Sequence, residues 1–193
     1  MVNIDNSSKF KSVCLDEVLN NRGVTDESDK GDGGINIWGN SFSKNNLPEF
    51  GLKASHGKIP FTFQKSAKTG FDNVVCRAQQ IKFGPTKISS LHFLAISERS
   101  NVAKICITHA GSILEILSVG VSDFWPDAPP NFGNELFLRG KCLHYPKHIQ
   151  DNMHPSIWYA ASNLQNTGIE ADGLLLPDNP AIHIFAITLE SPQ

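Results

Sequence analysis

The sequence predicts an all-β protein built as an antiparallel sandwich or barrel. Three features support this prediction: many short apolar runs follow one another after Gly57, turn-forming residues separate them, and little of the chain has helical periodicity. The 193 residues suffice for one domain with a sizeable core. No internal repeat or second unit is visible, so we expect a single domain over residues 1–193.

The first fifty residues are polar and rich in Asn, Asp, Gly and Ser. Residues Asp26–Gly34 have turn composition throughout. A few apolar residues between Ser12 and Asn20 allow one short helix there. Because this stretch has too few apolar residues for a core of its own, we expect residues 1–50 to elaborate an edge of the sandwich.

Nine runs after Gly57 are predicted to be strands because they are short, apolar and bounded by turn-forming residues. They are Ile59–Phe63, Gln79–Phe83, Leu91–Ser97, Val102–Thr108, Ile113–Val119, Glu135–Arg139, Ile157–Ala161, Leu174–Leu176 and Ala181–Leu189. The predicted turns are Ala67–Gly70, Gly84-Pro85, Glu98–Asn101, Ala110-Gly111 and Pro126–Gly133.

The last of these runs constrains the fold most, and the turn-forming residues Pro177–Pro180 precede it. Strict alternation would place Ala181, Phe185, Ile187 and Leu189 on one face and Ile182, Ile184 and Ala186 on the other. Both faces are then apolar. Such a strand is expected inside a sheet that is covered on both sides, so this strand is predicted to be central.

Composition and charge exclude several kinds of partner. The formal net charge is -2 and no basic run is present, so we expect no nucleic-acid partner. No apolar stretch approaches the roughly 20 residues of a membrane span, so we expect no membrane partner. The segment Met1–Lys11 lacks the apolar core of a signal peptide, which favours a cytoplasmic protein. A homodimer is left open.

Segments spread over most of the chain carry a resemblance to a known family. They are Asn20–Thr25, Asn40–Phe42 leading to Leu47-Pro48, Gly57–Phe61, Asp72–Val75 with Gln79 and Ile81, Leu91–Leu94, and Leu176–Pro180 with Ile182–Ala186. In this order they resemble a bacterial β-sandwich accessory domain of glycoside hydrolases such as α-mannosidases and α-fucosidases. The resemblance implies a galactose-binding-like, carbohydrate-binding jelly roll, often with a structural calcium ion. The segment Asp123–Tyr159 lies outside the resemblance.

The segment Ser122–Asn163 is the strongest candidate for a ligand site, because it holds two of the three Trp and both Tyr. Exposed aromatic rings on loops offer stacking faces to sugar rings or other flat ligands. We therefore expect ligand contacts from Trp125, Arg139, Trp158 and Tyr159. The alternative is that Trp125 and Trp158 are core residues, since Trp is mostly buried in proteins.

The same segment contains the candidate acid/base groups Asp123, His144, His148 and His154. Together with Cys142, the three histidines offer the imidazole and thiolate ligands that suit Zn²⁺. Their spacing matches neither a zinc finger nor a zincin, and a proline between the first two interrupts any helix that would align them. Zn²⁺ is therefore less favoured than Ca²⁺.

Asn20, Asp26, Asp29 and Asp32 offer hard oxygen ligands in the polar N-terminal stretch. Calcium takes roughly six to eight such oxygens. The spacing departs from the EF-hand pattern, because the glycine positions and the closing Glu are missing. We expect a bound Ca²⁺ to hold the loop and not to do chemistry, and the alternative is a solvated polar loop.

Two functions fit these features, and a protein-interaction domain is the third option. The first is a non-catalytic domain that binds a sugar, which the sandwich pattern, the resemblance and the aromatic segment favour. The second is an intracellular small-molecule enzyme of cyclase, isomerase or lyase type, with acid/base catalysis in an aromatic-lined cavity. An open platform would favour the first function, and a concave pocket beside a titratable group would favour the second.

Overall fold

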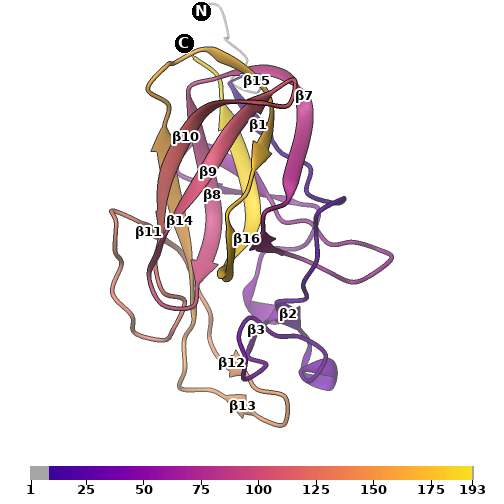
Figure 1. Cartoon of the computed structure of the whole chain (residues 1–193). Helices are drawn as coiled ribbons and strands as arrows, with labels where there is room; N and C mark the ends of the chain where they lie inside the picture. Colours follow the sequence, from indigo (N-terminus) through magenta and orange to yellow (C-terminus); the bar gives the residue numbers. More distant parts are fainter. Residues whose placement is uncertain (1–8, 193) are drawn as a thin grey trace, which may run out of the picture.

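The chain folds as the predicted β-sandwich (Figure 1). The computed structural model describes residues 9–192, so most of the stretch Met1–Lys11 lies outside the described residues. The strands of the two large sheets are β1 (Phe10–Ser12), β6 (Val74–Arg77), β7 (Gln80–Ile88), β8 (Ser90–Ser97), β9 (Asn101–His109), β10 (Ser112–Val121), β11 (Glu135–Arg139), β14 (Ser156–Asn163), β15 (Ile169–Leu175) and β16 (Asp178–Glu190).

The first large sheet has six strands in the order β1-β16-β8-β14-β11, with β6 also paired to β16. The second has four strands in the order β10-β9-β15-β7. Smaller elements complete the fold: a hairpin of β4 (Lys53–His56) and β5 (Ile59–Thr62), and a small sheet of β2 (Val24–Thr25), β3 (Ser41–Ser43), β12 (Leu143–His144) and β13 (Ile149–Gln150). No helix within residues 9–192 could cross a lipid bilayer.

The last strand is central, as predicted. β16 lies between β8 on one side and β1 and β6 on the other. Its neighbour β8 is buried at all eight positions, so both of its faces are covered. The two apolar faces of these strands therefore have two separate layers to pack against.

Two hydrophobic cores lie on opposite faces of the six-stranded sheet. The first fills the space between the two large sheets and includes Phe93 of β8 and Ile105 of β9. The second lies on the other face and includes Leu94 of β8 with Phe61 of the hairpin and Phe42 of the small sheet. The polar N-terminal stretch thus supplies part of a third layer, because it carries β2 and β3.

A β-bulge corrects the predicted faces of the last strand. The register of β16 against β8 shifts between Ile184 and Ala186. The first core receives Ile182, Ile184, Ile187 and Leu189, whereas the second receives Phe185 and Ala186. Strict alternation failed because a bulge inserts one residue and reverses the side-chain phase beyond it.

Three local predictions are wrong. The turn expected at Pro177–Pro180 is one of them, because Asp178, Asn179 and Pro180 already belong to β16. Residues 12–20 form no helix; they make one hydrogen-bonded turn in which the Leu15 carbonyl accepts the following N–H groups. Gly84 and Pro85 lie inside β7 and not at a turn. β7 is at the edge of its sheet and its register against β15 shifts between Lys82 and Thr86, and both an edge strand and a bulge tolerate a proline.

Each of the nine predicted runs overlaps a strand, and the bounds of β11 are those predicted. The seven strands that were missed are two to four residues long: β1, β2, β3, β4, β6, β12 and β13. The predicted turn at Ala110-Gly111 joins β9 to β10, and φ is positive at both residues (47° and 80°). This conformation matches the twist of a two-residue hairpin.

A buried carboxylate ties the N-terminal segment to the sandwich. Asp72, just before β6, is fully buried and accepts hydrogen bonds from the backbone N–H groups of Gly23 (2.8 Å) and Val24 (3.1 Å). The Asn73 amide donates a third bond to it at 2.8 Å. Burial nevertheless raises the pKa of Asp72 to about 6.

Two asparagines connect this carboxylate to the central strand. The Asn73 side-chain oxygen lies 3.0 Å from Nδ1 of His183 on β16. The Asn21 amide donates to that same oxygen at 3.2 Å and to the Gly34 carbonyl at 2.9 Å. Burial lowers the pKa of His183 to about 4, so its ring is neutral at neutral pH.

His183 and Asp72 contribute to the pH dependence of stability with opposite signs. The unfolded chain protonates His183 below about pH 6.5 and the folded chain only below about 4, so acidification across this window removes roughly 3 kcal/mol of stability. Asp72 gains its proton below about pH 6 when folded but only below 3.8 when unfolded, so its contribution rises on acidification.

We therefore expect His183→Gln to be less stable than the wild type at neutral pH. The difference in unfolding free energy should shrink towards about pH 4.5, because the wild type loses stability there and the variant does not. For Asp72→Asn, the difference in unfolding free energy from the wild type should instead grow as the pH drops. Urea unfolding of the three proteins at both pH values measures these differences. If the difference in unfolding free energy between each variant and the wild type is the same at both pH values, the buried network does not titrate in this way.

Candidate functional site

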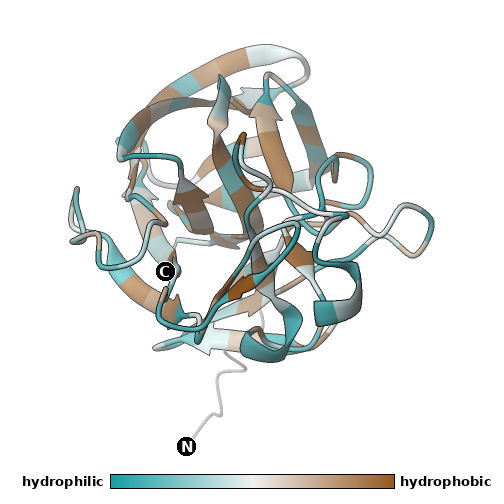
Figure 2. Cartoon of the chain, turned by 90° about the horizontal axis from the view of Figure 1, so that it is seen from below, coloured by the Kyte–Doolittle hydropathy of each residue, from teal (hydrophilic) through white to brown (hydrophobic). Residues whose placement is uncertain are grey.

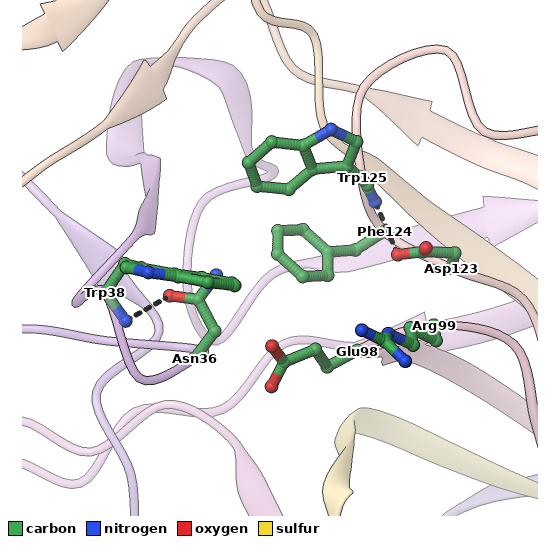
Figure 3. A pocket seen from close by; sticks show the side chains of 7 residues that line it. All are labelled: Asn36, Trp38, Glu98, Arg99, Asp123, Phe124 and Trp125. Atoms are coloured by element: carbon green, nitrogen blue, oxygen red, sulfur yellow. Dashed lines mark hydrogen bonds between the residues drawn. The ribbon is translucent and has the colours of Figure 1, made fainter.

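Three chain connections meet at one end of the sandwich and line a depression of about 190 Å³ (Figure 3). Seen from below in Figure 2, the loops at this end are mostly hydrophilic or neutral. The lining residues are Asn36 and Trp38 between β2 and β3, Glu98 and Arg99 between β8 and β9, and Asp123, Phe124 and Trp125 after β10.

Asn36 holds the turn that carries Trp38. Its side-chain oxygen accepts from the backbone N–H groups of Trp38 and Asn40, both at 3.1 Å, and its amide donates to the Asn40 side chain at 2.9 Å. Gly39 completes the turn with φ at 69°, and a Cβ there would lie 2.8 Å from Cγ of Pro146. Only glycine fits this position for both reasons.

The second connection is a tight turn held by Asn101. Its amide donates to the carbonyl groups of Glu98 and Arg99, both at 3.2 Å, and to the Ser97 hydroxyl at 2.9 Å. Arg99 has a positive φ of 63°, a conformation that L-residues adopt only when the surrounding structure imposes it. The turn therefore presents two charged side chains from a rigid base.

The third connection is held in place by the side chain and the backbone carbonyl of Asp123. Its side-chain oxygen accepts from the Trp125 N–H at 2.9 Å, and its carbonyl accepts from the indole N–H of Trp158 at 2.6 Å. The Phe124 N–H also donates to the Ser97 carbonyl at 3.1 Å, which joins this connection to the end of β8.

The hollow is open, with aromatic rings on two sides. Trp38 is 58% exposed and Trp125 is 36% exposed, whereas Phe124 between them is buried. Phe124 and Trp125 meet edge to face, with 5.9 Å between ring centroids. Figure 3 shows the Glu98 and Arg99 side chains below the Phe124 ring, on the side away from Trp125.

Of the four predicted ligand-binding residues, the structure brings only Trp125 to the depression. Trp125 lines the depression, but Trp158 is 1% exposed and lies in the core, so its ring cannot stack on a ligand. This corrects the expectation for Trp158, which supports the site only through its bond to Asp123. Arg139 is exposed on β11, 4.0 Å from Asp127, and does not line the depression.

Tyr159 belongs to a different polar cluster, on the face that the β4–β5 hairpin covers. Its hydroxyl is hydrogen-bonded to Nδ1 of His92 at 2.9 Å, and Nε2 of that ring lies 3.0 Å from a Glu190 carboxylate oxygen. Its ring stacks on His56 with 4.3 Å between centroids. Burial raises the pKa of Tyr159 and lowers that of His92.

The predicted acid/base groups are not gathered at the depression. Only Asp123 lines it. His144 is fully buried beside the Thr25 hydroxyl at 2.9 Å, and burial lowers its pKa. His148 is exposed and stacks on Tyr145, while His154 is half-buried elsewhere in the same segment.

The predicted calcium ligands Asn20, Asp26, Asp29 and Asp32 each have a partner within the protein, and Asp32 lies 3.8 Å from Arg22. Asp29 is bound by Arg22 and Asp26 by Lys44, while the Asn20 side chain pairs with the backbone of β6. Desolvation by itself would raise the pKa of Asp29. The hydrogen bonds from the Asp26 backbone and from Arg22 outweigh it, so the pKa of Asp29 is lowered. Within residues 9–192, no three His, Cys, Asp or Glu side chains are grouped to hold a metal ion, which applies equally to Zn²⁺.

Sequence reasoning missed four of the residues that form the depression: Asn36, Trp38, Glu98 and Arg99. A signal was present for Trp38, because a Trp followed by Gly-Asn in a turn-rich stretch has little chance of reaching a core. Glu98 and Arg99 lie in a correctly predicted turn, but only the fold brings that turn beside Trp125.

The chain matches the family model of the AziU2-like beta-sandwich domain over residues 9–193. It belongs to this family. No curated protein matches the chain. Membership of the AziU2-like family agrees with the β-sandwich that the resemblance implied, and a fold alone leaves the function to be argued from the site.

We expect Trp158→Ala to destabilise this AziU2-like domain by about 3–5 kcal/mol, because it empties a core position and leaves the Asp123 carbonyl without its donor. Trp125→Ala is the matched control and should change the free energy of unfolding by about 1 kcal/mol or less. Urea unfolding followed by circular dichroism measures both. Equal losses in the two variants would show that Trp125 is also a core residue.

Asn36→Ala should loosen the Trp38 turn while the sandwich stays folded. The variant removes the acceptor of two backbone N–H groups, so amide exchange at Trp38 and Asn40 should accelerate, and global stability should fall by about 1 kcal/mol. Amide exchange followed by NMR tests this. Asn36→Asp keeps the acceptor oxygen and should protect both amides better than the alanine variant. Unchanged exchange in Asn36→Ala would exclude this role for Asn36.

Proposed function

We propose that this domain binds a carbohydrate without acting on it, in the depression between Trp38 and Trp125. One observation carries the proposal: two half-exposed indoles, delivered by connections far apart in the sequence, border one hollow. An indole offers a flat apolar face with a polar edge, which complements the C–H face and the hydroxyl rim of a sugar ring.

The size and openness of the hollow favour recognition of a single ring over enclosure of a whole molecule. Its volume of about 190 Å³ is below the roughly 300–1,000 Å³ of pockets that enclose drug-sized ligands. The indole of Trp38 stays mostly in contact with water. An open platform of this kind suits one unit of a longer saccharide.

Hydrogen-bonding groups lie beside the two indoles. The Glu98 carboxylate can accept from sugar hydroxyls, and the Arg99 guanidinium can donate to them. Both sit on a turn that Asn101 holds in place. Because the turn is already held in place, only the Glu98 and Arg99 side chains have to become ordered on binding.

The placement of the four predicted acid/base candidates supports binding without catalysis by them. A general acid or base must lie within hydrogen-bond reach of the reacting atoms, and Asp123 is the only one of the four candidates that borders the hollow. Its carboxylate already accepts from the Trp125 N–H. Binding without chemistry is also what the resemblance to accessory domains of glycoside hydrolases implies.

The test is binding to an immobilised panel of oligosaccharides ending in galactose, mannose, fucose, glucose, N-acetylglucosamine or glucosamine, followed by calorimetry on the best binder. Trp38→Ala and Trp125→Ala should each weaken binding about tenfold, because each removes one stacking face. The double variant should lose detectable binding.

Phe132→Ala is the matched control, since Phe132 is an exposed aromatic residue that does not line the depression. This variant should bind like the wild type. Failure of the wild type to bind any member of the panel would overturn the proposal. Binding that survives in the double variant would place the carbohydrate site elsewhere.

A further inference from the structure

The carboxylate of Glu98 faces the depression without a cation to neutralise it. None of the ion pairs found within residues 9–192 includes Glu98, and no hydrogen bond to its carboxylate is found in that range. The side chain is partly buried and lines the depression, below the Phe124 ring in the view of Figure 3. A partly desolvated carboxylate of this kind is stabilised by an approaching positive charge.

The charges that border the hollow favour a cation. Two carboxylates, Glu98 and Asp123, face one guanidinium, that of Arg99. One oxygen of Asp123 accepts from the Trp125 N–H, whereas in residues 9–192 neither carboxylate oxygen of Glu98 has a hydrogen-bond partner. Arg99 is exposed and makes no ion pair with either carboxylate in the described part of the chain, so water screens its charge.

The aromatic rings add a second attraction for a cation. An ammonium group within about 6 Å of an indole face is attracted by the negative face of the ring. Trp38, Phe124 and Trp125 line the same depression as Glu98. Ring faces and a carboxylate therefore converge on one small volume, which is the arrangement that selects an ammonium group.

From this convergence we infer that the ligand is an amino sugar with a free ammonium group, its ring against the indoles and its ammonium paired with Glu98. The inference rests on the proposed carbohydrate function and adds the chemical class of the sugar. N-acetylation removes the charge and enlarges the substituent, so an acetylated unit is expected to bind more weakly than a free amine.

Three tetrasaccharides with the same β-1,4-linked backbone test the inference: those of glucosamine, N-acetylglucosamine and glucose. Calorimetry with the whole domain, below neutral pH where the amine is protonated, should give about tenfold tighter binding of the glucosamine tetramer. Added salt should reduce this preference more than it reduces binding of the glucose tetramer.

Matched charge variants locate the preference. Glu98→Gln keeps the shape of the side chain and should reduce binding of the glucosamine tetramer to the level of the glucose tetramer, whose own affinity should hardly change. Arg99→Gln is the control of opposite sign and should leave the preference intact or increase it, because it removes a positive charge from the same rim.

The outcomes separate this inference from the proposed function. Equal binding of the three tetramers would overturn the amino-sugar inference and leave carbohydrate binding in place. A preference that survives in Glu98→Gln, or tighter binding of a galacturonate tetramer than of the glucosamine tetramer, would also overturn it. If the three tetramers and the whole panel fail to bind, both the inference and the proposed function are wrong.

Discussion

The buried Asp72 carboxylate accepts hydrogen bonds from the backbone N–H groups of Gly23 and Val24, and the path of the N-terminal segment depends on it. These donors stand where β2 begins, so the carboxylate fixes how the segment crosses the end of the sandwich. A side chain on residue 23 would collide with Asn73, because a Cβ there would lie 2.5 Å from the Asn73 amide nitrogen. The segment then covers the second core and delivers Trp38 to the rim of the depression.

The central strands of the six-stranded sheet are covered on both faces, which sets this domain apart from a simple two-layer sandwich. The bulge at residues 184–186 of β16 allows one strand to supply large side chains to both cores. Covering the second face requires the hairpin, the small sheet and the loops between them. The depression lies where this third layer meets the ends of β8 and β10, so it exists only because all three layers are present.

The long strands could be predicted from the sequence because their apolar runs are local signals, and β11 shows this most directly. The seven short strands could not, because two to four residues acquire a partner only through the tertiary fold. Trp125 and Trp158 looked alike in the sequence, although Trp158 lies within a predicted strand and Trp125 beside a predicted turn. That difference separates the buried ring from the exposed one. The meeting of Trp38 with Glu98 carries no local signal.

The two walls of the depression differ in how they are anchored. Trp125 and Glu98 stand on connections that follow β10 and β8 of the two large sheets, whereas Trp38 stands on the loop between β2 and β3, whose turn is held by hydrogen bonds to Asn36. A partial opening that released this segment would dismantle the hollow and leave the two large sheets intact. A ligand that contacts both indoles would therefore hold the third layer against the two large sheets. Its apparent affinity would include the fraction of molecules in which the segment is already in place.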